Sequence, residues 1–406
     1  MLLICCYNYS MFGKLTSKEK GKLILVLDIR SSSVGGSLFR AEKSGVPKII
    51  FSTREPLSHD ASVNIERFLP TTLNVLDQVV NKIFKAGLGV PESVFCVLAS
   101  PWYVSQTRLI NLKKPTPFIF SMALADELIK KEVELFKKDH MEKYINTNQA
   151  VEIIELRSVK TLLNGYETED PIDQKVEEVD MTLFISMSPE QVLSGFKNVI
   201  KKYFHHDTVK FSSFTMASFA VMKNIFPDQP NFLLIDVGGE VTDISMVKKN
   251  VLRESISFAM ARNFMIRGVS GALGCSEAEA ESYLALLTAG HAEGPTESKL
   301  RPIVDKLKLD WLKSFQDSLA NLSKDISVPY TIYLSADKDM LNFFGKIIEA
   351  EQFNQYTLTE SKFKIVFLDT ETLHGVAEFE KDTERDPLIM TDSAFINHFL
   401  VYPSKI

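Results

Sequence analysis

Cysteine is scarce in this sequence and is not arranged for metal or redox chemistry. The 406 residues include four cysteines, of which Cys5 and Cys6 are adjacent whereas Cys96 and Cys275 are isolated. The CxxC spacing of zinc ribbons and dithiol redox sites does not occur, so both kinds of site are excluded. We expect these thiols to stay reduced and buried, as is usual in a cytosolic protein.

Long apolar runs and concentrations of basic charge are also missing. No stretch reaches the roughly 18 consecutive apolar residues that indicate a transmembrane helix. The net charge is -6 and the Lys and Arg residues are interspersed with acids, which excludes nucleic acid as the main partner. What is present is an ordinary globular composition, 45% hydrophobic and 24% charged, in a chain long enough for roughly two to four domains.

The two ends of the chain carry no clear targeting signal. The opening "MLLICCYNYSMFGK" has the apolar character of a leader, but it lacks a basic first part and a small-residue cleavage site. We expect a tail over residues 1–20, and whether translation starts at Met1 or Met11 stays open. The ending "INHFLVYPSKI" is too short and too weakly charged to predict an amphipathic membrane helix.

A strand that ends in an acid and runs into a turn occurs twice. Residues 23–55 predict three strands in succession, the first of which, "LILVLDI", carries Asp28 near its end. Residues 232–258 repeat the pattern, with "FLLID" ending at Asp236 before two glycines. Two copies of a three-strand unit in one chain indicate a duplicated α/β core.

The segments between and after the two copies complete the domain prediction. Strand, helix, strand, strand is the order expected over residues 92–205, and a mostly helical part follows residue 263, starting with a capping box at Ser276 and Glu279. The predicted divisions are a tail over 1–20, a first subdomain over 21–91 and 206–230, an inserted interaction subdomain over 92–205, and a second half over 231–406 with its helical subdomain.

Three motifs carry a resemblance to a known fold. "LDIRSSSVGG" is similar to the first phosphate loop of the actin-like ATPases, "IDVGGEVTDIS" to the second, and "IYLSADKDM" lies where their adenosine loop falls. The resemblance implies an α/β, actin-like ATPase fold with a duplicated three-strand-plus-helices core and an inserted strand-helix-strand-strand subdomain. The position of that insert resembles the cell-division protein FtsA and the type IV pilus assembly protein PilM, and so do "LLNGYETEDP" and "SFAMARNFMIRGVSGALGCSEAEAE".

The resemblance also implies a site for ATP and Mg2+. Asp28 and Asp236 would be the catalytic residues, orienting Mg2+ through water or orienting the attacking water. The other residues implied to bind the cofactor lie on the three loops: Ser31, Ser32, Ser33, Gly238, Gly239, Thr242, Asp243, Ser335 and Ala336.

Three departures from the family pattern weaken that expectation. Arg30 replaces the glycine of the first loop, Glu240 adds a negative charge to the second, and Ser335-Ala336-Asp337 stands where glycines normally let the backbone pass under the nucleotide. The side chain of Arg30 could either crowd the phosphates or pair with them. We therefore predict weak nucleotide binding and slow or absent hydrolysis, and leave open whether the protein is an enzyme.

Two functions follow from the resemblance. The first is an FtsA-like cytoskeletal protein of bacterial cell division, able to self-associate and linking filaments of the tubulin-like FtsZ to the membrane. The second is a PilM-like pilus assembly scaffold that binds a membrane-protein peptide. Either protein would lie in the cytoplasm at the inner face of the cell membrane, with membrane contact that is peripheral or indirect.

Overall fold

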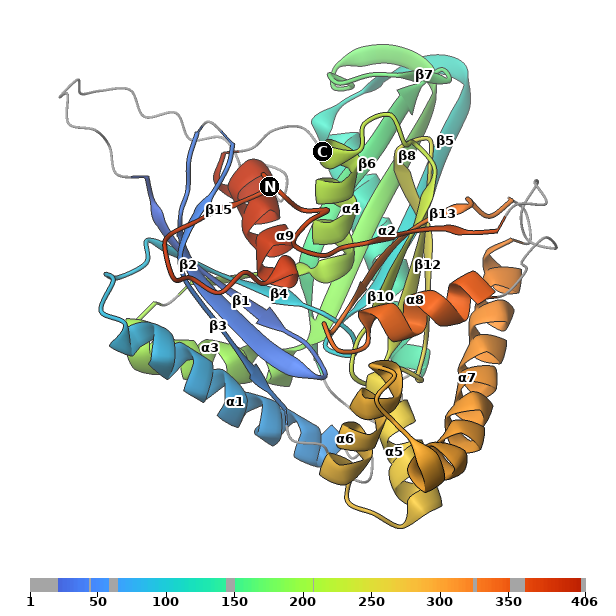
Figure 1. Cartoon of the computed structure of the whole chain (residues 1–406). Coiled ribbons are helices and arrows are strands. Elements are labelled where there is room, and N and C mark those ends of the chain that lie inside the picture. The colour runs from blue at the N-terminus through green and yellow to red at the C-terminus, as the bar shows by residue number, and fades with distance from the viewer. Residues whose placement is uncertain are drawn as a thin grey trace.

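The chain folds into three β-sheets with helices on their faces (Figure 1). The computed structural model describes residues 21–43, 45–57, 65–143, 150–206, 208–323, 327–350 and 362–402. The predicted tail over 1–20 lies outside the described residues, so that prediction is not tested.

The first sheet has the strand order β15-β3-β2-β1-β4-β9. At its centre β1 (Leu23–Ile29) is buried along its whole length, antiparallel to β2 and parallel to β4. Two helices, α1 (Ile65–Lys85) and α3 (Glu190–Phe204), share one apolar core with the sheet. The remaining strands are β2 (Ser33–Arg40), β3 (Lys48–Pro56), β4 (Ser93–Leu98), β9 (Val209–Ser213) and β15 (Glu378–Phe379).

The second sheet repeats the pairing of the first. Its order is β12-β11-β10-β13-β14, and β10 (Phe232–Val237) is antiparallel to β11 and parallel to β13, as β1 is to β2 and β4. The predicted duplication is therefore confirmed. The other strands are β11 (Thr242–Lys248), β12 (Val251–Phe258), β13 (Thr331–Ala336) and β14 (Lys364–Phe367).

Four helices lie between β12 and β14 in the chain, as the sequence predicts for the part after residue 263. The helix α6 begins after Ser276, whose side chain accepts from the Glu279 amide while the Glu279 carboxylate accepts from the Ser276 amide. The predicted capping box is thus confirmed. The four helices are α5 (Arg262–Leu273), α6 (Glu277–Thr288), α7 (Gly294–Leu322) and α8 (Leu341–Ala350).

The third sheet has the order β5-β8-β6-β7, with the helix α2 (Met122–Lys143) packed on it. Within the described ranges its strands pair only with one another, although β5 contacts β12 of the second sheet and β6 contacts β9 of the first. This sheet covers fewer residues than the insert predicted over 92–205. The strand β4 pairs with β1, and α3 packs on α1, so both belong to the first sheet and its helical layer. The separate sheet runs from residue 104 to 189, over β5 (Val104–Phe120), β6 (Val151–Leu163), β7 (Tyr166–Glu167) and β8 (Gln174–Pro189).

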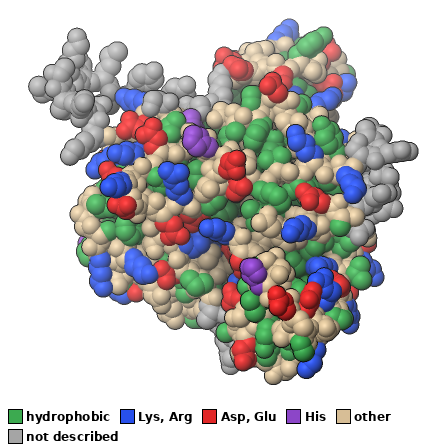
Figure 2. Space-filling model, in the orientation of Figure 1, with side chains coloured by type: hydrophobic (Ala, Val, Ile, Leu, Met, Phe, Trp, Pro, Cys, Tyr) green, Lys and Arg blue, Asp and Glu red, His purple; other side chains and the backbone are tan. Residues whose placement is uncertain are grey.

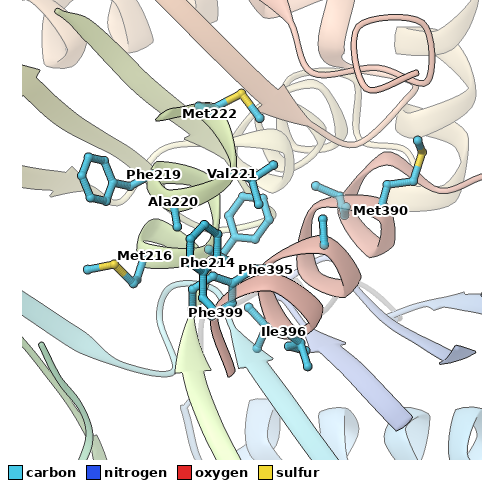
Figure 3. Close-up of a cluster of buried hydrophobic side chains, with 14 of the residues drawn as sticks. Phe214, Met216, Phe219, Ala220, Val221, Met222, Met390, Phe395, Ile396 and Phe399 are labelled. Atoms are coloured by element: carbon cyan, nitrogen blue, oxygen red, sulfur yellow. The ribbon is translucent and has the colours of Figure 1, made fainter. Parts of the chain in front are cut away.

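The end of the chain returns to the first sheet instead of staying with the predicted second half over 231–406. Glu378 of β15 pairs with Lys48 of β3, and the helix α9 (Pro387–Phe395) packs on β1, β2 and α4 (Phe214–Ile225). Figure 3 shows Phe395 of α9 beside Phe214 of α4, with the π-helix η1 (Ile396–Val401) continuing the contact. Every residue of α9 from Leu388 to Phe395 is buried, so the helix is covered on several sides.

We predict that Phe395→Ala lowers the free energy of unfolding by about 3–5 kcal/mol, because Phe395 is fully buried in this cluster and truncation leaves a cavity. Urea denaturation followed by tryptophan fluorescence measures the change. The control is Leu309→Ala on α7, where the side chain is 64% exposed and the loss should stay below about 0.5 kcal/mol. Equal losses in the two variants would contradict the packing of α9.

Candidate functional site

The two predicted acids face each other across an arginine. Asp28 lies near the end of β1 and Asp236 near the end of β10, and the fully buried guanidinium of Arg30 lies between them. Arg30 Nη2 donates to Asp236 Oδ1, and Arg30 Nη1 is 3.9 Å from Asp28 Oδ1. Desolvation alone would lower the pKa of Arg30, but the charges of Asp236 and Asp28 outweigh it and hold the pKa above its ordinary value.

A second arginine extends the network to the C-terminal helix. Arg54 of β3 donates to Asp28 Oδ2 at 2.6 Å, to Ser33 Oγ at 2.9 Å and to Asp386 Oδ2 at 2.6 Å. Asp386 is also the N-cap of α9, since its carboxylate accepts from the first amides of that helix. Burial raises the pKa of Asp28 in spite of the opposing charges of Arg54 and Arg30.

The two predicted phosphate loops touch. Ser31 Oγ accepts from the Gly239 and Glu240 amides, each at 3.0 Å. A Cβ atom at Gly239 would lie 2.7 Å from the Ser31 carbonyl carbon and oxygen, so only glycine permits this approach. The amides that would hold a phosphate from the second side therefore have a partner within the protein.

The predicted adenosine side is also linked internally. Arg262 at the start of α5 donates to Asp339 at 3.0 Å and to Glu281, and lies 3.8 Å from Asp337. The hydroxyl of Ser335 donates to Asp236 Oδ1 at 2.7 Å. These contacts join the loop after β13 to α5, α6 and the acid of β10.

Glu240 adds no uncompensated negative charge to the second loop. Its carboxylate accepts two bonds from Arg267, at 2.8 and 2.6 Å, and one from Asn263 at 2.8 Å. The repulsion of phosphate predicted from this residue is consequently weakened by a bidentate pair within the protein.

The other predicted binding residues lie close by but face protein atoms. Thr242 Oγ1 donates to the Met260 carbonyl at 2.7 Å, and Asp243 accepts from Ser257 and from Ser100. Burial raises the pKa of Asp243 to about 6, against the Ser257 hydrogen bond. Ser32 is buried, and its carbonyl accepts from the Leu57 amide. The Gly238 amide donates to the Val241 carbonyl, and Ala336 lies opposite Val237 in the pairing of β13 with β10.

These residues do not fit Mg-ATP as they are arranged. A guanidinium stands between the carboxylates that would orient Mg2+, a metal that requires oxygen ligands. The cavity beside Asp236 and Asp243 measures about 10 Å3, which is room for about one water molecule. The binding and catalytic roles implied for Asp28, Asp236 and the three loops thus stay predictions, and this arrangement does not accommodate the cofactor.

Sequence reasoning missed one further acid. Asp392 on α9 is fully buried, and neither of its carboxylate oxygens has a hydrogen-bond partner among the described residues. Burial, reinforced by the charge of Asp28, raises the pKa of Asp392 well above its ordinary value. A carboxyl group in such surroundings is expected to be neutral in the folded protein.

We predict that Arg30→Gly, which restores the family's glycine, costs about 3–5 kcal/mol of stability because the buried Asp28 and the half-buried Asp236 lose their shared cation. Millimolar Mg2+ should then raise the melting temperature of the variant but not of the wild type, measured by scanning fluorimetry. Arg30→Lys keeps a cation and should not respond to Mg2+. Arg253→Ala on β12 controls for loss of an arginine elsewhere, and a wild type that responds as strongly as Arg30→Gly would refute the arrangement.

We predict a pH-dependent gain in stability for Asp392→Asn. The pKa of Asp392 is raised in the folded state, so between its ordinary value of 3.8 and the raised value the folded chain binds more protons than the unfolded one. The stability of the wild type therefore falls as pH rises through this window, whereas asparagine has no such loss. Urea midpoints of the two proteins should diverge in favour of the variant from pH 4.5 to pH 8, and the exposed Asp228→Asn should show no such trend.

Comparisons with known proteins give the fold. No protein-family model and no curated protein matches the sequence. The solved PilM-PilN type IV pilus biogenesis complex contains a chain that is 13% identical, with a TM-score of 0.60 over 92% of this chain and 96% of that one. The MamK double helical filament is also similar, with 10% identity and a TM-score of 0.45 over 93% of this chain and 98% of the MamK chain. A Bacteroides thetaiotaomicron protein of actin-like ATPase fold and unknown function is similar at 8% identity, with a TM-score of 0.44 over 94% of this chain and 99% of that one. With its duplicated sheets, the chain has the predicted actin-like ATPase fold.

Proposed function

We propose that this protein is a scaffold of actin-like fold that binds a segment of another protein and does not depend on a nucleotide. The observation that carries the proposal is the position of Arg30, buried between Asp28 and Asp236. In phosphoryl transfer the protein contributes mainly positioning and charge stabilisation around a phosphate and its metal ion. Here the positive charge between the two acids belongs to the chain itself, so no step of that chemistry is assigned to them.

The fold comparison supports a scaffold that works through a partner. The PilM chain to which this one is similar was solved in a complex with PilN. We take from this the PilM-like function, in which the partner segment comes from a membrane protein. The FtsA-like function, with FtsZ as partner, gains no support from the comparisons and stays a prediction. No helix among the described residues is long and apolar enough to cross a membrane, so in this proposal the partner anchors the protein at the inner face of the membrane.

The separate sheet offers the surface for that partner. Of the eleven large hydrophobic side chains that are exposed among the described residues, five lie between residues 104 and 189. β5 is the edge strand of its sheet, and β12 of the second sheet contacts part of it. In this proposal the rest of the β5 edge pairs with an extended segment, although Pro115 and Pro117 remove two of its donors. The five exposed side chains are Leu109, Ile119, Met122, Leu135 and Tyr166.

The test compares partner binding with and without nucleotide. A photo-crosslinking amino acid at position 109, incorporated in cells, identifies the partner by mass spectrometry, and calorimetry then measures the affinity of its purified segment. We expect Mg-ATP to change this affinity less than about twofold. Leu109→Asp should weaken it at least tenfold, whereas Leu309→Asp, which changes an equally exposed leucine on α7, should not. Tight binding of Mg-ATP to the wild type, or a partner affinity that follows the nucleotide, would refute the proposal.

A further inference from the structure

The helices α1 and α3 end side by side at the edge of the first sheet that lies away from the second sheet, on the left in Figure 1. The ring of Phe84, in the last turn of α1, lies 5.9 Å from the ring of Tyr203 and 5.8 Å from that of Phe204. The chain then runs through residues 86–91 into β4. We name residues 84–90 the α1 end loop.

The α1 end loop is fixed at its start by the ring of Phe84 and at its end by two hydrogen bonds, and residues 87–90 between them are exposed. The Glu92 amide donates to the Leu23 carbonyl at 2.7 Å, and the His206 ring bonds to the Pro91 carbonyl. Gly87 and Gly89 have φ values of 64° and 118°, which turn the chain, and nothing lies within 4 Å of a Cβ built at Gly87. The loop therefore presents its side chains outward from fixed ends.

Three of the eleven exposed large hydrophobic side chains fall within these seven residues. Phe84 is 50% exposed, Leu88 38% and Val90 70%. Single exposed apolar residues are ordinary on a protein surface, but a group of them around an exposed loop indicates a contact. None of the three belongs to the separate sheet proposed as the partner surface.

Lysines flank this apolar group. Lys85 ends α1, and Lys201 and Lys202 lie in the last turn of α3, all of them exposed. Their attraction to the carboxyl ends of two helices explains lysine at these positions, but it does not explain the apolar side chains between them. Of the nearby acids, Asp77 is bonded by Lys202 and by Tyr203, and Glu92 is exposed. Figure 2 shows Lys/Arg and hydrophobic side chains next to each other along this left edge.

We propose that the α1 end loop inserts its apolar side chains into the interface of an anionic membrane, with Lys85 and Lys201 beside the lipid headgroups. Apolar side chains that project between basic residues match the interfacial region of a bilayer, where apolar burial and attraction to anionic lipid add. An exposed loop offers no groove for a peptide. Stable membrane attachment generally takes two signals. In this proposal the partner anchored in the membrane is the first signal and the α1 end loop is the second. Holding the chain at the membrane then increases its effective concentration for that partner.

The full-length protein is tested by sedimentation with vesicles of phosphatidylcholine alone or with phosphatidylglycerol added. We expect weak binding to the anionic vesicles that falls at least fivefold between about 50 and 500 mM NaCl, because headgroup attraction is screened by salt. Leu88→Ser/Val90→Ser and Lys85→Glu/Lys201→Glu should each reduce binding at least fivefold. Leu309→Ser/Lys313→Glu on α7 is the matched control and should bind as the wild type does.

Three outcomes would overturn the proposal. The wild type could fail to sediment with either vesicle type, the binding could be independent of lipid charge, or the loop variants could bind as well as the control. The last outcome would assign the binding to another segment, such as residues 1–20, which all the variants keep unchanged. Melting temperatures of the variants close to that of the wild type exclude unfolding as the cause of a loss. Because partner binding at position 109 is measured without lipid, its failure and the failure of this membrane contact are separate results.

Discussion

The buried guanidinium of Arg30 is the constraint around which the centre of the molecule is arranged. A charge that is fully removed from water is tolerated only when it is paired and hydrogen-bonded, and Arg30 finds its counter-charges on the first sheet, at Asp28, and on the second, at Asp236. Its Cζ atom also lies 4.5 Å from the ring centroid of Phe214, and its carbonyl accepts from Trp102 Nε1. One side chain thus links both sheets and the helix α4.

The charge balance of this cluster explains why one of its acids has a raised pKa. Arg30 and Arg54 face four carboxylates, and the pairs leave Asp392 without a donor. A fourth negative charge in a region of low dielectric would cost several kcal/mol, which favours the neutral form of Asp392. The raised pKa of Asp392 links the stability of the central cluster to pH.

Periodicity and turn residues made the repeated strands and the acids near their ends predictable. In each half, a strand, its acid and the following turn lie within about ten residues of one another, so they can be recognised in the sequence. Arg30 in place of the glycine of the family's first phosphate loop can also be read directly from the sequence. The partners of this arginine network were not predictable, because Arg54 and Asp386 are 332 residues apart and only the fold brings them together. Asp386 before a proline is a local helix-start signal, but nothing local says which sheet that helix covers. The boundary at β4 was missed for a similar reason: alternating strand and helix patterns do not tell which sheet a strand joins.

The same geometry offers a way to hold an actin-like fold together at its centre without a nucleotide. In the arrangement implied by the resemblance, the two phosphate loops would bind a phosphate chain and its metal ion from opposite sides, and the bound group would fix the positions of the two halves. Here contacts within the chain join the two halves. Arg30 donates to Asp236 and lies 3.9 Å from Asp28, and Ser31 Oγ accepts from the amides of Gly239 and Glu240. A link made of side chains does not vary with the concentration or hydrolysis of a nucleotide. The two halves are then held in one arrangement whether or not a nucleotide is present, which is consistent with the scaffold function that we propose.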